Sequence, residues 1–213
     1  KRKSDSFGFF RSAGDDRTVA AVSPNGYLPA IHTTIKDASF AFGYRRDLAN
    51  DWKADISINY GASELAFHES DSLNVSYWYE KKADGSIYGE SPREADTGTL
   101  KFNQTTFNAD IKGPVQLGGA SIFLATGFEY RADNYQIVAG DPVSYQYGRT
   151  NNPAIVIKTP SGATAASGIQ GFPGYTPATA VDSGRHNIAL FLDAEHKPVN
   201  ELTLGGAVRY EKY

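Results

Sequence analysis

The connections between the predicted strands of this chain alternate between tight turns and long loops. Segments of alternating apolar and polar residues are joined by tight turns at residues 48–51, 116–119 and 198–201. The connections between these turns are long and cover about residues 15–34, 69–103 and 139–184. Every second connection of an antiparallel meander lies at the same end of the strands. One end of the sheet therefore carries the tight turns and the other end carries the long loops. Short turns on one side and long loops on the other are typical of a transmembrane β-barrel.

Alternation of apolar and polar side chains predicts about seven β-strands, each with one face toward an apolar environment. In segment 52–62, for example, Ile56 lies on one face and Asp55 on the other. The predicted strands cover residues 5–13, 37–47, 52–62, 105–114, 121–133, 186–195 and 202–211. We therefore expect an all-β fold, namely a transmembrane antiparallel up-and-down β-barrel.

The placement of charges favours a membrane wall over a soluble sheet. In the four clearest strands the central charges all fall on the polar face; these strands are 52–62, 121–133, 186–195 and 202–211. A Lys or Arg on the lipid face at mid-membrane costs roughly 2 to 4 kcal/mol, so a barrel requires this segregation. A soluble β-sandwich also alternates, but its turns are distributed over both ends without a strict short-long order.

The composition argues against several other classes of protein. The chain has 213 residues, of which 40% are hydrophobic, a formal net charge of -3 and no cysteine. The chain contains no stretch of about 18 apolar residues, which a membrane-spanning helix would need. A barrel wall needs only every second residue to be apolar. The weakly acidic balance, without a basic block, gives no support to nucleic-acid binding.

Four segments carry a resemblance to a known family. They are residues 127–131 (GFEYR), 141–145 (DPVSY), 168–175 (GIQGFPGY) and 207–213 (AVRYEKY). In this order they resemble the barrel of TonB-dependent outer-membrane receptors, and the resemblance covers essentially the whole chain. It implies a barrel of about 22 strands, filled by an amino-terminal plug, that imports scarce ligands by coupling to the TonB protein.

Seven strands cannot close a membrane barrel, because an open edge would leave backbone groups unpaired in hydrocarbon. We therefore expect residues 1–213 to form part of one barrel domain whose plug and C-terminal strands lie outside this sequence. The resemblance implies the outer membrane of a Gram-negative bacterium, with the long loops extracellular and the short turns periplasmic. The implied partners are TonB, through the plug, the transported ligand, and outer-membrane lipid and lipopolysaccharide.

The resemblance implies nutrient uptake, with a siderophore, cobalamin or an oligosaccharide as the ligand, and no cofactor. A structural or adhesive barrel without transport is the alternative. No Cys nucleophile, Gly-x-Ser-x-Gly motif or Walker loop supports an enzyme, which would require a Ser-His or Asp-His pair within hydrogen-bond reach at the lumen rim. The histidines at positions 32, 68, 186 and 196 share no metal-ligand spacing, so we expect no metal site.

The longest predicted loop, residues 139–184, holds the candidate ligand-binding residues. Aromatic side chains with a neighbouring Arg can stack on sugars, catechols or flat macrocycles and can hold an anionic ligand. The candidates are Tyr145, Tyr147, Arg149, Phe172 and Tyr175. The alternative is a self-packed loop whose tyrosines cover one another.

A second set of candidates lies on the predicted polar face and forms a charge lattice in the lumen. The lattice consists of Glu129, Arg131, Asp193, Arg209 and Glu211. An assumed register gives two rows of side chains across three strands. In each row a carboxylate and a guanidinium lie two strands apart, at a distance of about 9.5 Å. The rows are Glu129, Ala189 and Arg209, and then Arg131, Asn187 and Glu211. Such a lattice would stiffen the wall, dock the plug or line the ligand path. Across the first tight turn, Arg45 and Asp55 are expected to form an ion pair.

Overall fold

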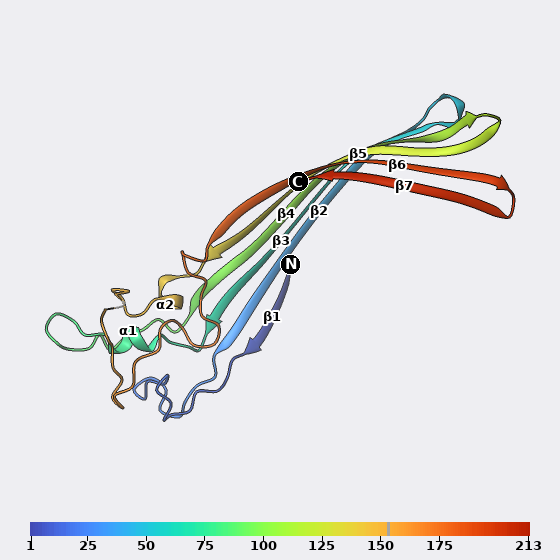
Figure 1. The fold of residues 1–213 in the computed structure, drawn as a ribbon. Helices are drawn as coiled ribbons and strands as arrows, with labels where there is room; N and C mark the ends of the chain where they lie inside the picture. The colour runs from blue at the N-terminus through green and yellow to red at the C-terminus, as the bar shows by residue number, and fades with distance from the viewer. Residues whose placement is uncertain (153) are drawn as a thin grey trace. The chain divides into compact units, whose positions relative to one another are not determined.

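The computed structural model describes residues 1–152 and 154–213, which form one seven-stranded sheet in the order β1-β2-β3-β4-β5-β6-β7 (Figure 1). The strands are β1 (Arg2–Phe7), β2 (Ala30–Asp47), β3 (Lys53–Ser70), β4 (Ala95–Leu117), β5 (Ala120–Ala139), β6 (Val181–Val199) and β7 (Leu202–Lys212). Each strand pairs with the next one along the chain, which confirms the predicted all-β, up-and-down antiparallel arrangement. Within the described residues β1 and β7 are not neighbours, so this sheet is open.

Strand lengths differ from the prediction in both directions. β4 has 23 residues and begins at Ala95, well before the predicted start at residue 105. Residues 95–99 at its start are polar or small on both faces, so the ladder continues where the apolar signal is lost. β1 is shorter than the predicted segment 5–13 and ends at Phe7. Beyond it the N–H of Gly8 donates to the carbonyl of Pro29 at 2.9 Å, but Pro29 has no N–H to donate in return and the ladder is interrupted.

The alternation of tight and long connections is confirmed. The tight connections are a 3₁₀ turn, η1 (Ala49–Asp51), and the residue pairs 118–119 and 200–201. Asn50 and Gly119 adopt φ angles of 59° and 84° there, a left-handed conformation that Asn and Gly tolerate best. The long connections cover residues 8–29, 71–94 and 140–180 and hold two short helices, α1 (Val75–Tyr79) and α2 (Pro142–Tyr145). No helix in the described ranges is long and apolar enough to cross a membrane.

The chain comprises two compact units, of which the wall unit consists of residues 37–62, 102–135 and 183–213. Large apolar side chains at alternate positions are exposed in this unit; Leu190 is 55% exposed and Val208 is 64% exposed. We call the following residues the exposed apolar band: Phe40, Phe42, Tyr44, Ile56, Ile58, Tyr60, Ile111, Ile188, Leu190, Leu192, Leu204, Val208 and Tyr210. An exposed apolar surface of this kind marks a face that meets lipid or a partner.

The second compact unit, the loop unit, consists of residues 1–36, 63–101 and 136–182. Among the described residues, every buried apolar side chain of the core except Ala189 belongs to this unit. Its core is therefore built largely by the long connections and the strand ends beside them. The wall unit instead presents most of its large apolar side chains outward.

The register of the last hairpin corrects one prediction. Arg209 pairs with Phe191, and Glu211 pairs with Ala189, so the predicted placement of Ala189 in a row with Arg209 is wrong. The pairing shifts between His196 and Val199, a stretch that contains Pro198, which cannot donate a ladder hydrogen bond. Because the error amounts to two residues, every side chain keeps the face that was predicted for it.

Candidate ligand-binding site

The three long connections, residues 8–29, 71–94 and 140–180, pack against one another, and we call them the loop assembly. They share one buried apolar cluster, made of Val19, Tyr27, Leu73, Val75, Ile157 and Ala165. The buried hydroxyl of Tyr27 donates a hydrogen bond to the carbonyl of Arg17 at 2.8 Å. Burial raises the pKa of Tyr27 to about 12. The connections thus have a core of their own, which long loops seldom do unless they are functional.

Asn74 holds two of the connections together. Its Oδ1 accepts the backbone N–H of Tyr77 at 3.2 Å and so caps the N-terminus of α1. Its Nδ2 donates to the carbonyls of Val143 and Gln146, both at 2.9 Å, at the two ends of α2. The side chain is fully buried. One amide therefore satisfies backbone groups of two helices that lie about 70 residues apart in the sequence.

Two serines beside Asn74 extend this polar contact. Ser72 Oγ donates to the carbonyl of Gln170 at 2.5 Å and accepts its N–H at 2.8 Å. Ser76 Oγ accepts the N–H of Gly148 at 2.8 Å. Both serines are fully buried, where an unpaired polar group would cost about 1 to 3 kcal/mol. No sequence motif pointed to these residues, although the spacing Ser72-x-Asn74-x-Ser76 places all three within one short segment.

Glu80, at the C-terminal end of α1, receives the next part of the third connection. Its buried carboxylate accepts the hydroxyl of Thr150 at 2.7 Å and the backbone N–H of Arg149. A charged acceptor makes such hydrogen bonds roughly twice as strong as neutral ones. Glu80, a residue of the second connection, therefore binds both Arg149 and Thr150 of the third connection.

The side chain of Arg149, a predicted ligand-binding residue, is engaged inside the loop assembly. Its guanidinium lies over the rings of Tyr77 and Tyr88, with its carbon 5.2 and 4.6 Å from the two ring centroids. Nη2 also donates to the Glu90 carboxylate at 3.2 Å. Cation–π contacts of this kind contribute about 0.5 to 2 kcal/mol. Arg149 thus joins the second and third connections.

The predicted tyrosines of the same segment are also used internally. Tyr147 packs against the apolar cluster, and its hydroxyl accepts the N–H of Ile157 at 2.8 Å. Tyr145 ends α2 and is half-buried. The alternative of a self-packed loop therefore describes Tyr147 and Arg149 better than a ligand-contacting role does.

Phe172 and Tyr175 lie in a different place from Tyr147 and Arg149. They contact each other edge to face, with ring centroids 5.8 Å apart. Phe67 of β3 completes the group, with centroids 4.8 Å from Phe172 and 6.5 Å from Tyr175. The five predicted residues therefore do not form one constellation. The aromatic group of Phe67, Phe172 and Tyr175 secures the last part of the third connection to the strand.

Glu69 lies next to this aromatic group and is fully buried. Its Oε1 accepts the N–H of Phe172, while Oε2 has no hydrogen-bond partner among the described residues. Gly171 adopts a φ of 124°, and a Cβ at this position would lie 2.6 Å from Oε2. Burial raises the pKa of Glu69 to about 8, although the Phe172 hydrogen bond opposes the rise. Glu69 is the penultimate residue of β3 and belongs to the loop unit, whereas the exposed apolar band belongs to the wall unit.

Two cavities of about 300 Å³ open on the loop assembly. The first is mainly apolar with two lysines and is lined by residues that include Tyr79, Lys81, Ile87, Ile155, Ile157 and Lys158. The second is lined by Glu90, Ser91, Pro92 and Arg149. Ligand pockets are typically about 300 to 1,000 Å³. Both cavities are therefore at the lower end of the range for a small ligand.

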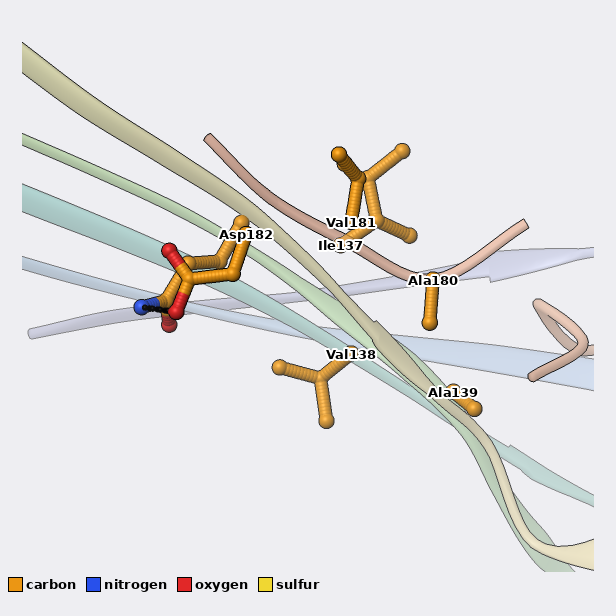
Figure 2. A pocket seen from close by; sticks show the side chains of 7 residues that line it. Ile137, Val138, Ala139, Ala180, Val181 and Asp182 are labelled. Carbon is orange, nitrogen blue, oxygen red and sulfur yellow. Dashed lines mark hydrogen bonds between the residues drawn. The ribbon is translucent and has the colours of Figure 1, made fainter. Parts of the chain in front are cut away.

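A third hollow, of about 370 Å³, lies where the chain leaves β5 and enters β6 (Figure 2). Its lining includes Val138, Ala139, Ala180, Val181 and Asp182. Gln136 Nε2 donates to Asp182 Oδ2 at 3.0 Å across it. Since the lining consists mostly of short apolar side chains, this hollow offers little for specific recognition.

Several charged residues of the wall unit form ion pairs with one another. Arg209 forms ion pairs with Glu129, at 2.9 Å, and with Glu211. Asp193 is half-buried, and Arg131 has a buried Nε without a partner among the described residues. Near the first tight turn, Arg45 and Asp55 are 2.7 Å apart, which confirms the ion pair predicted there. No group of three or more His, Asp or Glu residues in the described part of the chain is arranged to hold a metal ion.

Comparison with known proteins adds one finding to this geometry. Residues 2–213 match the model of a family described as TonB dependent receptor-like, beta-barrel. No curated protein and no solved structure matches the chain. The match spans both the wall unit and the loop unit.

Proposed function

Because the chain belongs to the TonB-dependent receptor-like β-barrel family, we propose that it takes up a scarce ligand by TonB-coupled active transport. The family is one of bacterial outer-membrane receptors and transporters. The observation that carries the proposal beyond the family is the loop assembly, in which three long connections form one packed body with two cavities. Such a body offers a preorganised capture surface, which lowers the entropic cost of binding.

The ligand is proposed to bind the loop assembly outside the cell, in contact with Tyr145 and the aromatic pair Phe172 and Tyr175. Arg149 lines one of the cavities even though its guanidinium is held by neighbours. A siderophore, cobalamin and an oligosaccharide are the candidate ligands. Each offers rings, hydroxyls or anionic groups that aromatic and guanidinium side chains recognise.

The orientation that we propose places the long connections outside the cell and the tight turns in the periplasm. The exposed apolar band supports contact of the wall unit with lipid. Four residues before Phe40 in β2, Lys36 pairs with Glu64 at 2.7 Å, and Lys101 approaches the same carboxylate at 3.8 Å. Two ammonium groups around one carboxylate leave a net positive site suited to lipopolysaccharide phosphates.

We further propose that these strands belong to a larger closed barrel, of about 22 strands, that contains a plug through which TonB acts. The support is physical: β1 and β7 each have one unpaired edge in the described sheet. Unpaired backbone groups in hydrocarbon cost several kcal/mol each. In this barrel the charged residues Glu129, Arg131, Asp193, Arg209 and Glu211 would face the lumen and the plug.

Uptake of labelled nutrients by cells that express or lack the protein tests this function. We expect the expressing cells to take up one class of labelled ligand faster, and we expect a proton uncoupler or loss of TonB to abolish the difference. Unchanged uptake of siderophore, cobalamin and oligosaccharide probes, together with cell adhesion that depends on the protein, would instead favour a structural or adhesive barrel.

The proposed contacts are tested with a Phe172→Ala/Tyr175→Ala double variant. We expect it to weaken binding of the identified ligand by about fivefold to 150-fold, since each lost stacking contact is worth roughly 0.5 to 1.5 kcal/mol. Leu28→Ala, which changes an exposed apolar residue of the same loop assembly, is the matched control. Equal binding by both variants would remove the aromatic pair from the site.

A further inference from the structure

Three side chains on neighbouring strands of the loop unit form a continuous hydrogen-bonded chain. His32 Nδ1 lies 2.7 Å from Asp5 Oδ1, and His32 Nε2 lies 2.8 Å from Ser70 Oγ. Asp5 and His32 are direct cross-strand partners between β1 and β2. Ser70 is the last residue of β3. A hydroxyl, an imidazole and a carboxylate in this order form the arrangement that activates a serine nucleophile.

Both sides of the imidazole are used in the way that this chemistry needs. With the proton on Nδ1 donated to Asp5, Nε2 accepts the hydrogen bond from Ser70 and can take its proton. The side chain of His32 is 39% exposed and that of Asp5 is 69% exposed. Ser70 is half-buried. The three side chains therefore lie at the surface of the loop unit.

Asp71, which follows the serine, adds a backbone feature. It adopts a φ of 51°, in the left-handed region that non-glycine residues rarely occupy. In many serine hydrolases the nucleophile lies at a strained turn directly after a strand, and the N–H of the next residue stabilises the oxyanion. In this chain the residue directly after Ser70 is Asp71, so the N–H of Asp71 has the position in the sequence that the oxyanion donor has in those enzymes.

The neighbouring His68 provides an internal comparison. Its ring centroid is 6.0 Å from that of His32. Its Nδ1 lies 2.8 Å from Asp96 Oδ1, and its Nε2 lies 3.9 Å from Glu94 Oε2. The two histidines therefore have a similar carboxylate contact at Nδ1, but His68 faces a second carboxylate where His32 faces a hydroxyl.

We propose that Ser70, His32 and Asp5 form a catalytic triad that hydrolyses small carboxylic esters at the surface of the loop unit. Ser70 Oγ attacks the ester carbonyl carbon while its proton passes to His32 Nε2. The tetrahedral intermediate then collapses, the carbon–oxygen bond to the alcohol breaks, and the alcohol leaves with the proton from Nε2. Water attacks the acyl-serine, gives one proton to His32, and releases the carboxylic acid and Ser70 with its proton restored.

An ester is the fitting substrate class because the site is open. Asp5 and His32 are too exposed to exclude water, and water screens the electrostatic stabilisation on which amide hydrolysis depends. An alcohol is also a better leaving group than an amine. The activity expected here is separate from transport and uses residues outside the proposed ligand contacts.

Ester hydrolysis by the full-length protein in detergent tests the proposal. We expect the protein to hydrolyse p-nitrophenyl acetate and to be labelled by a fluorophosphonate at Ser70, as located by mass spectrometry. Ser70→Ala should abolish both signals, and His32→Gln should lower hydrolysis by at least about 100-fold. Asp5→Asn should lower it as well, by a smaller factor because this carboxylate is exposed.

His68→Gln is the matched control, since it removes the second histidine and leaves the Ser70 pair intact. We expect it to retain hydrolysis within about twofold of the unchanged protein. Equal hydrolysis by the Ser70→Ala variant, or labelling of a serine other than Ser70, would overturn the proposal. Heat-dependent gel migration of each variant shows whether the barrel is folded, so that loss of activity is not confused with loss of structure.

Discussion

Arg209 of β7 reaches Glu129 of β5 across the intervening strand β6, with Nη2 and Oε1 2.9 Å apart. The same guanidinium contacts Glu211 on its own strand through Nε. Strands that are not neighbours in the sheet are thereby joined by one side chain. The charges of the polar face thus form a lateral tie across three strands.

Removing this tie should cost little stability, because all three side chains are partly exposed. We expect a Glu129→Gln and Arg209→Gln double-mutant cycle to give a coupling energy of about 0.2 to 1 kcal/mol. The measurement is the midpoint of urea unfolding for the protein in lipid vesicles. The Arg45–Asp55 pair, on adjacent strands, is the comparison cycle. A coupling energy above about 3 kcal/mol would show that the Glu129–Arg209 pair is desolvated.

Asn74→Ala should loosen the loop assembly without unfolding the barrel. The variant leaves two buried carbonyls and one helix N-terminus without their partner, at about 1 to 3 kcal/mol for each unsatisfied group. We expect proteolysis within residues 71–94 and 140–180 to become at least tenfold faster. Asn200→Ala, in an exposed tight turn, is the control and should behave as the unchanged protein does. Resistance of both variants would mean that the apolar cluster alone holds the connections together.

The docking of the third connection should weaken as the pH rises. In the folded protein burial raises the pKa of Glu69 from 4.5 to about 8, so the native state holds a proton that the undocked state loses. The stabilisation of the docked third connection by this proton is complete below about pH 4.5 and is lost as the pH rises toward 8. Above about pH 8 the free energy of docking no longer changes with the protonation of Glu69. Hydrogen exchange of residues 170–175, corrected for intrinsic rates, should follow this course.

The Glu69→Gln variant separates the proton from the contact. A neutral amide can accept the N–H of Phe172 through its oxygen and cannot titrate, so we expect its exchange rates to be constant from pH 5 to 9. Glu201→Gln, in an exposed tight turn, should keep the pH dependence of the unchanged protein. The same pH dependence in all three proteins would exclude Glu69 as its source.

Arg149→Lys should weaken the contact between the second and third connections despite keeping the charge. A lysine cannot stack a planar group between Tyr77 and Tyr88 as the guanidinium does. We expect a loss of about 0.5 to 2 kcal/mol in the stability of the loop assembly, measured as faster proteolysis at residues 140–152. The control is Lys82→Arg. The ammonium group of Lys82 lies over one ring, that of Tyr88, whereas Arg149 lies over two. An Arg149→Lys variant as resistant as the control would show that charge alone is sufficient.

The wall could be predicted from the sequence because its determinants are local. Alternation at Ile56 and Asp55, and the turn residues Asn50 and Gly119, each act within a few positions. The last register was wrong by two residues because the turn lies at residues 200–201, between the paired Val199 and Leu202, and not at a centre near Val199; the irregularity between His196 and Val199 changes the pairing by only one residue. The direction of each side chain survived this error, since a strand has a period of two.

The site was much less predictable, because its contacts join residues far apart in the sequence. Nothing near Asn74 indicates that its partners are Val143 and Gln146. The aromatic residues of the third connection suggested a ligand surface, but Tyr147 and Arg149 serve the packing of the loops. The Ser70–His32 contact likewise requires the register of three strands to be known before it can be recognised.

The hydrogen bonds of Ser72, Asn74, Ser76 and Glu80 have a mechanical consequence. They fasten one connection to another along most of its length, so neither can swing away alone without breaking several buried bonds. In the proposed uptake of a ligand, a motion of either connection would therefore carry the second and third connections together. Within the loop unit these two connections therefore act as one stiff body.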